Sequence, residues 1–327
     1  MKYKKLGSAG FAVSAVSVGT WGIGGSFWDA TTKEESLRAI DTMLDQGVNL
    51  IDTAPIYGFG NPTLDDLGFG HAEILVGEAI RQRRDKVLVF TKCGLNYDRS
   101  IGPKSLCKNT SYEHIIAECE ESLRRLGTDY IDLLFVHWPD ANTPIEEVVR
   151  AMDRLIRDGK IRSYGLSNFT PEETLKAHEM LPVTAVQLKY SMVDTESEQV
   201  LRQLHEKGIG TMTYGSLGAG ILGGHIREIP DFGAMDTRNT FYDYYREPKF
   251  SRIMDLLKEM DVIAEQRQVP LSQIAINWSI GQPYVDTAIC GVSKSTHALE
   301  NCRAAEWELT AAETESLDEA IRRIRLS

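Results

Sequence analysis

The sequence lacks any apolar run near the roughly 18 residues that a membrane span requires. Its first seven residues, Met-Lys-Tyr-Lys-Lys-Leu-Gly, contain no apolar stretch of the kind found in a signal peptide. Paired cysteine spacing is missing too, because no CxxC occurs among Cys93, Cys107, Cys119, Cys290 and Cys302. These absences predict a cytoplasmic protein whose thiols are free.

Two further classes of site are missing. The seven histidines contain no HxxxH pair, so we expect no metal centre. Lys and Arg are outnumbered by Asp and Glu, 36 against 47, which gives a net charge of -11. Such a charge repels nucleic acid and anionic lipid, and we expect neither nucleic acid nor a membrane as a partner.

What remains is an ordinary globular composition, with 42% hydrophobic and 25% charged residues in 327. That apolar mass is sufficient for a large core. Because single α/β barrels often exceed about 250 residues, we expect one domain over residues 1–327.

Strand-like and helix-like segments alternate along the chain, which predicts parallel strands with helical crossovers. The predicted strands are Ala15–Val18, Asn49–Ile51, Val87–Phe90, Ile131–Phe135, Ile161–Tyr164, Val183–Gln187, Ile209–Met212 and Val285–Ile289. Predicted helices between them include Lys33–Asp45, Ala72–Arg83, Tyr112–Leu126, Pro144–Arg157, Pro171–Met180 and Thr195–Lys207. Residues around Tyr3 and Phe11 are expected to form a hairpin that plugs one end.

A closed (β/α)₈ barrel and an open doubly wound sheet both suit this alternation. The polar residues at the strand ends favour the barrel, since a barrel gathers the carboxyl ends of all its strands at one mouth. Those residues are Asp52, Tyr57, Lys92, His137, Asn168, Gln187 and Tyr214. Three long segments, 59–70, 94–110 and 215–248, follow strands and are expected as loops over the same mouth.

Three short motifs bear on chemistry: Asp52-Thr-Ala-Pro-Ile-Tyr57, Thr91-Lys92 and Val136-His137. Alone, each is more often structural. Together they suit proton transfer to an alkoxide: Tyr57 can give the proton, and a nearby Lys92 is expected to lower the Tyr57 pKa. Asp52 would hold the lysine charge, and His137 would orient the carbonyl.

These motifs, in this order, resemble the catalytic tetrad of the aldo-keto reductases, and the resemblance runs from end to end of the chain. It implies an NAD(P)-dependent oxidoreductase on a TIM barrel that interconverts a carbonyl (aldehyde, ketone or sugar) and an alcohol. Asp52, Tyr57, Lys92 and His137 would be catalytic. The substrate pocket would be lined by Trp21, Trp28, Tyr57 and Trp138, although core packing is the alternative for each tryptophan.

The same resemblance implies the cofactor contacts. Segments near Gly19-Thr20-Trp21, Gly165–Phe169, Gln187, Tyr214–Leu222 and Gly291–Asn301 match the nicotinamide, pyrophosphate and adenosine regions. The implied residues are Thr20, Trp21, Asp52, Ser167, Asn168, Gln187, Tyr214, Gly215, Ser216, Leu217, Gly218, Gly220, Leu222, Gly291, Ser293, Lys294, His297, Glu300 and Asn301. Lys294 is the one cation of Gly291–Asn301, so we expect NADP(H) to be preferred modestly, with NAD(H) usable.

Gly218–Gly223 also spells GxGxxG, the Rossmann pattern, but no helix and acidic strand are expected after it. A second function stays open: a cofactor-binding interaction or regulatory subunit, like the channel β subunits that share this resemblance. The complete tetrad favours the enzyme.

Overall fold

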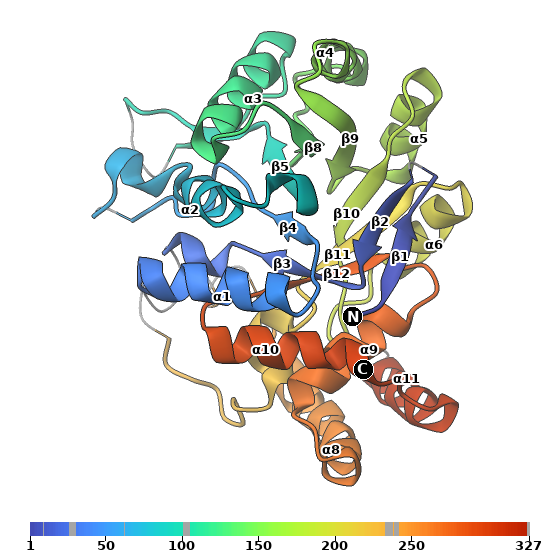
Figure 1. Ribbon diagram of the computed structural model, residues 1–327. Helices are drawn as coiled ribbons and strands as arrows, with labels where there is room; N and C mark the ends of the chain where they lie inside the picture. The colour runs from blue at the N-terminus through green and yellow to red at the C-terminus, as the bar shows by residue number, and fades with distance from the viewer. Residues whose placement is uncertain are drawn as a thin grey trace.

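A computed structural model describes residues 1–8, 10–25, 31–61, 63–100, 105–232, 238 and 242–325. At its centre eight parallel strands close into a barrel surrounded by helices (Figure 1). Around the barrel the strands are β3 (Val16–Gly19), β4 (Leu50–Asp52), β5 (Leu88–Cys93), β8 (Ile131–Val136), β9 (Ile161–Ser167), β10 (Ala185–Lys189), β11 (Gly210–Tyr214) and β12 (Thr287–Gly291). The predicted (β/α)₈ barrel is confirmed, and each predicted strand overlaps an observed one.

Helices cover the outside of the barrel, because an all-parallel sheet must bury both of its faces. They are α1 (Lys33–Asp45), α2 (His71–Ile80), α3 (Tyr112–Leu126), α4 (Ile145–Arg157), α5 (Pro171–Met180), α6 (Glu198–Glu206), α8 (Lys249–Arg267), α9 (Leu271–Gly281), α10 (Ser295–Arg303) and α11 (Ala311–Arg325). Local sequence sets several ends: α5 begins with a capping box between Thr170 and Glu173 and with Pro171 in its first turn. No described helix is both long enough and apolar enough to cross a membrane.

An antiparallel hairpin of β1 (Tyr3–Leu6) and β2 (Phe11–Ser14) closes the end of the barrel where the strands begin. Leu6 and Val13 are fully buried against barrel-interior residues such as Leu50 and Met212. The expected hairpin plug is therefore confirmed. It leaves the opposite end, where the strands finish, as the open mouth.

Three long segments were expected as loops over the mouth, and residues 62, 101–104, 233–237 and 239–241 of them lie outside the described residues. The described part of one segment differs from expectation. Residues 94–110 are not only a loop: β6 (Leu95–Tyr97) and β7 (Leu106–Lys108) pair as a two-stranded antiparallel sheet. Short strands in a polar segment leave little hydrophobic pattern to detect.

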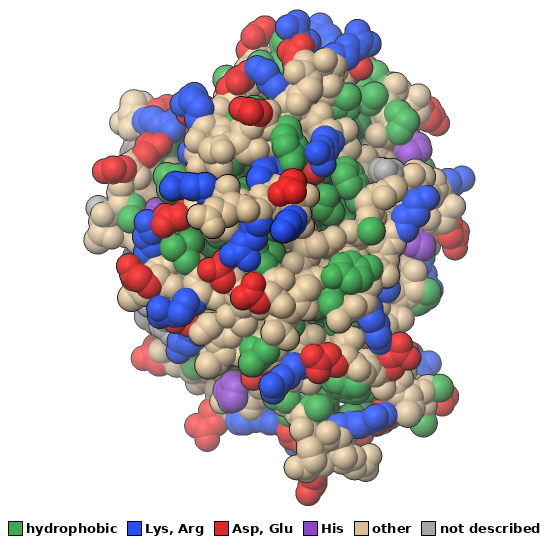
Figure 2. Space-filling model, viewed as in Figure 1, with side chains coloured by type: hydrophobic (Ala, Val, Ile, Leu, Met, Phe, Trp, Pro, Cys, Tyr) green, Lys and Arg blue, Asp and Glu red, His purple; other side chains and the backbone are tan. Residues whose placement is uncertain are grey.

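On the face shown in Figure 2, acidic and basic side chains are interspersed over the surface.

Candidate active site

The open mouth of the barrel brings together Lys92, Asp52 and Tyr57. The Lys92 ammonium, on β5, is 0% exposed and donates three hydrogen bonds. Its acceptors are Asp52 Oδ1 at 2.6 Å, the Thr53 carbonyl oxygen at 2.9 Å and Tyr57 Oη at 3.1 Å. An ammonium has three N–H groups, so each is satisfied, and this compensates for removing its charge from water.

Asp52, at the end of β4, is fixed from two sides. Its Oδ1 accepts from Lys92, and its Oδ2 accepts from Gln187 Nε2 of β10 at 2.7 Å. The Asp52 carbonyl oxygen accepts from Thr20 Oγ1 at 3.0 Å. Side chains of β5 and β10 therefore hold the carboxylate, and Thr20, just after β3, holds the backbone that carries it.

A second chain of hydrogen bonds runs through the carboxyl ends of the next strands. Asn168 follows β9 with a left-handed φ of 64°, which asparagine tolerates better than most residues. Its Nδ2 donates to the His137 carbonyl oxygen at 3.0 Å and to Ser167 Oγ at 3.1 Å. Its Oδ1 accepts from Tyr214 Oη at 2.9 Å. These contacts fix the half-buried Tyr214 ring at the mouth and the backbone that carries His137.

Burial dominates the ionisation of this site. Burial and the Asp52 carboxylate raise the Tyr57 pKa well above its usual value, and burial together with Lys92 lowers the His137 pKa well below its usual value. Burial also raises the pKa of Asp52, and the Lys92 charge opposes this rise. Burial lowers the pKa of Lys92, and the Asp52 charge opposes this fall. The expectation that the Tyr57 pKa is lowered is wrong, because burial and the Asp52 carboxylate both raise it.

Aromatic side chains line the space above Tyr57. The Trp21 ring stacks on the Tyr57 ring at 6.3 Å between centroids, and the His137 ring meets Tyr57 edge-on at 6.0 Å. Trp138 lies next to His137 with Lys108 Nζ 5.1 Å from its ring centroid. Trp28, also expected in the pocket, lies outside the described residues.

Residues 215–223 form a tight loop after β11. Leu217 has φ -99° and ψ 11°, and Gly218, Ala219 and Gly220 follow with φ of 55°, 55° and 96°. Within this loop the N–H groups of Gly218, Gly220 and Leu222 donate to the carbonyl oxygens of Gly215 and Leu217, so these donors close the turn. Ser216 anchors the loop to β12 by donating to the Ile289 carbonyl oxygen at 3.3 Å, while Gly215 and Leu222 lie at its two ends.

The segment Gly291–Asn301 runs from the end of β12 into α10. Asn301 Nδ2 donates to the Gly291 carbonyl oxygen at 3.4 Å, and Glu300 accepts a hydrogen bond from Ser272. Lys294 and His297 are exposed, and Ser293 is half-buried. The structure therefore places this predicted stretch on the surface next to the mouth.

Residues 15–322 match the aldo/keto reductase family. The chain belongs to this family. Aldo-keto reductase YhdN of Bacillus subtilis (strain 168) is 34% identical, with 97% of this chain and 93% of the relative covered. A probable voltage-gated potassium channel subunit beta of Arabidopsis thaliana is 31% identical, with 94% and 92% covered. The structure of the glycerol dehydrogenase AKR11B4 from Gluconobacter oxydans superimposes with a TM-score of 0.87 at 32% identity, covering 98% of this chain and 95% of that one.

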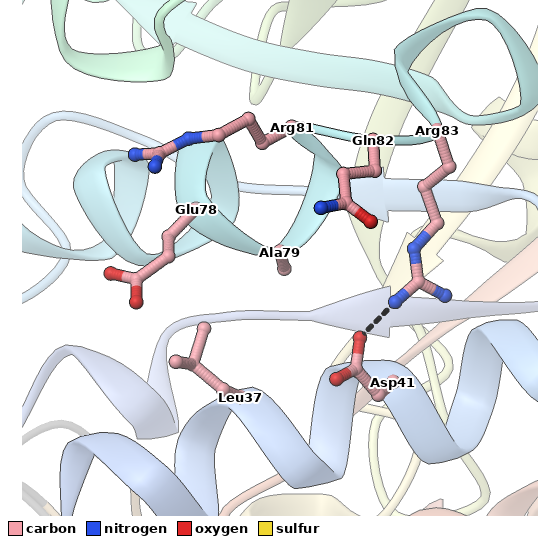
Figure 3. Close-up of a pocket in the computed structure, with 7 residues that line it drawn as sticks. All are labelled: Leu37, Asp41, Glu78, Ala79, Arg81, Gln82 and Arg83. Atoms are coloured by element: carbon pink, nitrogen blue, oxygen red, sulfur yellow. Dashed lines mark hydrogen bonds and ion pairs between the residues drawn. The ribbon is translucent and has the colours of Figure 1, made fainter.

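A hollow of about 450 Å³ on this aldo/keto reductase lies away from the mouth (Figure 3). It is lined by Leu37 and Asp41 of α1, by Glu78 and Ala79 of α2 and by residues 81–83 after α2, and an ion pair between Arg83 and Asp41 spans it. Residues 81–83 lead into the beginning of β5, so the hollow is at the opposite end of the strands from Lys92. It takes no part in the candidate site.

Sequence reasoning missed two contacts in the candidate site and the segment beside it. The Thr53 carbonyl oxygen is a ligand of the Lys92 ammonium, and a backbone acceptor leaves no signal in the residue type. Glu35 of α1 contacts Ser295 across 260 residues of sequence. Its place in the first turn of a helix indicates only a favourable interaction with the helix dipole.

Proposed function

We propose that this chain is an NAD(P)H-dependent carbonyl reductase that also runs as an alcohol dehydrogenase. The observation that supports it most is the Lys92 ammonium, which contacts both Asp52 Oδ1 and Tyr57 Oη. That arrangement stabilises negative charge on the phenolic oxygen when its proton leaves. A role for all four residues Asp52, Tyr57, Lys92 and His137 is part of this proposal.

In the reduction, Tyr57 gives its proton to the carbonyl oxygen. The raised Tyr57 pKa keeps the hydroxyl protonated at neutral pH. An alkoxide is a much stronger base than a phenolate, so transfer remains favourable even from a donor with a raised pKa. Lys92 then stabilises the phenolate through its 3.1 Å hydrogen bond, and Asp52 keeps the lysine charged and in place.

His137 acts as a neutral imidazole, because its lowered pKa keeps it unprotonated. A neutral ring still has one N–H to donate. Its edge-on position 6.0 Å from the Tyr57 ring suits a donor that orients the carbonyl oxygen toward Tyr57 Oη. Trp21 and Trp138 would form the walls that exclude water.

The residues at the mouth fit a nicotinamide cofactor, which when bound supplies a hydride in reduction or accepts one in oxidation. The half-buried Tyr214 offers a fixed ring for stacking, and Gln187 keeps a side-chain oxygen free of the Asp52 contact. Ser167 and Asn168 would flank the carboxamide, the loop Gly215–Leu222 would hold the pyrophosphate, and Gly291–Asn301 would carry the adenosine. Lys294 favours NADP(H) on sequence grounds; the hydrogen bonds from Ser295 to Glu35 weigh against that preference.

The substrate class is a small carbonyl or its alcohol. The similar structure from Gluconobacter oxydans is described as a glycerol dehydrogenase. Short polyols and the corresponding aldehydes or ketones are therefore the first compounds to test. All five cysteines are free, which supports the proposal of a reducing compartment such as the cytoplasm.

The second candidate is a cofactor-binding subunit of a larger assembly, because one relative is described as a probable channel subunit beta. Steady-state assays with NADH and NADPH against short aldehydes and polyols separate the two. Repeated turnover that consumes many equivalents of cofactor supports the reductase. A single slow turnover with tightly held cofactor would instead support the subunit.

A further inference from the structure

A carboxylate from elsewhere in the chain, that of Glu35, lies at the beginning of α10. Ser295 is the first residue of α10, and both its backbone N–H and its Oγ donate to Glu35 Oε1, at 2.7 and 2.9 Å. The free N–H groups at such a helix end, together with the helix dipole, favour a negative charge. In this chain a carboxylate from α1 takes that position.

The Glu35 carboxylate is fixed and ionised. Its other oxygen, Oε2, accepts from Arg38 Nη2 at 2.6 Å and from Arg38 Nε at 3.0 Å. Thr31 Oγ1 adds a second link between the two segments by donating to the Ser293 carbonyl oxygen at 3.0 Å. The hydrogen bonds from Ser295 and Arg38 hold the pKa of Glu35 at about 2, so its charge is present throughout the physiological range.

The position of this carboxylate bears on the proposed function, in which Gly291–Asn301 carries the adenosine end of the cofactor. A 2′-phosphate needs cations and N–H donors, and Glu35 already uses the Ser295 N–H and the Arg38 guanidinium. A 2′-hydroxyl is suited to the opposite environment, because it can donate a hydrogen bond to a carboxylate. The exposed Lys294 is the remaining cation of Gly291–Asn301.

We propose that Glu35 is a specificity-determining residue that makes this site select NAD(H) over NADP(H). The inference rests on the proposed function and reverses the preference that Lys294 suggested. Like charge repels the 2′-phosphate, and displacing Glu35 to admit it would break its hydrogen bonds to Ser295 and Arg38.

Equilibrium binding tests this directly, with isothermal titration of NADH, NADPH, 5′-AMP and 2′,5′-ADP; the last two report on the adenosine end without turnover. For the unmodified protein we expect NADH to bind at least about tenfold more tightly than NADPH, and 5′-AMP more tightly than 2′,5′-ADP. Glu35→Gln keeps an oxygen for Ser295 but removes the charge and frees Arg38. It should strengthen NADPH and 2′,5′-ADP binding by about tenfold and change NADH binding by less than about threefold.

Glu34→Gln is the matched control, because Glu34 is exposed, adjacent and in the same helical turn. It should leave both affinities unchanged, and cooperative thermal melts should show that both variants are folded at the temperature of the titration. Equal or tighter NADPH binding by the unmodified protein, or an equal effect of Glu35→Gln on both cofactors, would overturn the inference alone. Binding of neither dinucleotide would contradict the proposed function itself.

Discussion

At the scale of single residues, the site depends on charges removed from water. Lys92 and Asp52 are 0% and 2% exposed and lie 2.6 Å apart, so each is the main partner of the other. Removing one would leave a buried charge uncompensated. The same burial sets the protonation of Tyr57 and His137, and this makes the pH dependence of the reaction a direct test.

Reduction and oxidation should respond differently to pH. Because the Tyr57 pKa is raised, Tyr57 stays protonated at neutral pH. Because the His137 pKa is lowered, His137 stays neutral at the same pH. Single-turnover reduction should therefore be flat between about pH 6 and pH 9. Alcohol oxidation needs the phenolate, whose fraction grows as pH rises toward the Tyr57 pKa, so its rate should increase about tenfold per pH unit. A reduction rate controlled by an ionisation near neutrality would contradict this assignment.

A buried ion pair between Glu73 of α2 and Arg125 of α3 is hydrogen-bonded to Thr91 of β5. Glu73, 0% exposed, accepts from Thr91 Oγ1 at 2.6 Å and from Arg125 Nε at 2.6 Å. Arg125→Met would leave the Glu73 carboxylate buried without its cation, and we expect the free energy of unfolding to fall by about 3–5 kcal/mol. Denaturant unfolding measures it.

Arg124→Met is the control for that change, since Arg124 is the neighbouring residue and its side chain is 66% exposed in a surface pair with Glu121. Its unfolding midpoint should move much less. Equal shifts for the two variants would show that the buried pair has no special role.

At the scale of elements, residues 59–61 and 63–70 form a compact cap on the rim of the mouth. Phe59 and Phe69 pack with Tyr97 of β6, and the Phe59 and Tyr97 centroids are 4.4 Å apart. Asp66 accepts from Tyr97 Oη and from Arg99 Nη2. The segment begins two residues after Tyr57, so its position is fixed relative to the proposed proton donor.

Replacing Leu64–Leu67 with a Gly-Ser segment should release this cap. If the cap shapes the substrate site, KM for carbonyl substrates should rise by about three- to tenfold, or their ranking should change. Cofactor affinity should stay the same, because the residues proposed for the nicotinamide and phosphates follow other strands. Unchanged KM and an unchanged ranking across several substrates would show that the cap has no role in substrate binding.

The strand and helix periods in the sequence predicted a parallel α/β fold, and the polar residues at the strand ends favoured the closed barrel over an open sheet. The same periods placed Asp52, Lys92, His137 and Gln187 at strand ends, and a barrel converts strand ends into one site. The β6–β7 pair was not predictable in this way, since each strand has three residues in a polar segment. The net pKa of Tyr57 was mispredicted because burial depends on packing, which charges in a motif do not reveal.

At the scale of the whole molecule, the two ends of the chain are tied together. Lys2 Nζ lies 2.7 Å from Glu308 Oε1, and Lys4 Nζ donates to the carbonyl oxygens of Ile280 and Val285 at 2.6 and 2.7 Å. Closing the barrel requires β12 to pair with β3, so the last strand completes the sheet of the first.

We therefore propose that residues 1–327 unfold as one domain. Far-UV circular dichroism, near-UV circular dichroism and loss of cofactor binding should follow one coincident thermal transition. Two resolved transitions, or loss of cofactor binding well before loss of secondary structure, would contradict single-domain behaviour.

The central claim, that Tyr57 is the proton donor of a carbonyl reductase, is tested most directly by Tyr57→Phe in a single-turnover assay. The phenylalanine keeps the ring that stacks on Trp21 and removes only the hydroxyl that contacts Lys92. Hydride transfer to a short aldehyde should slow by about 10²–10⁴-fold, while the dissociation constant of NADH stays within about threefold of the unmodified value. A variant that binds cofactor and reduces the aldehyde at nearly the original rate would contradict the claim.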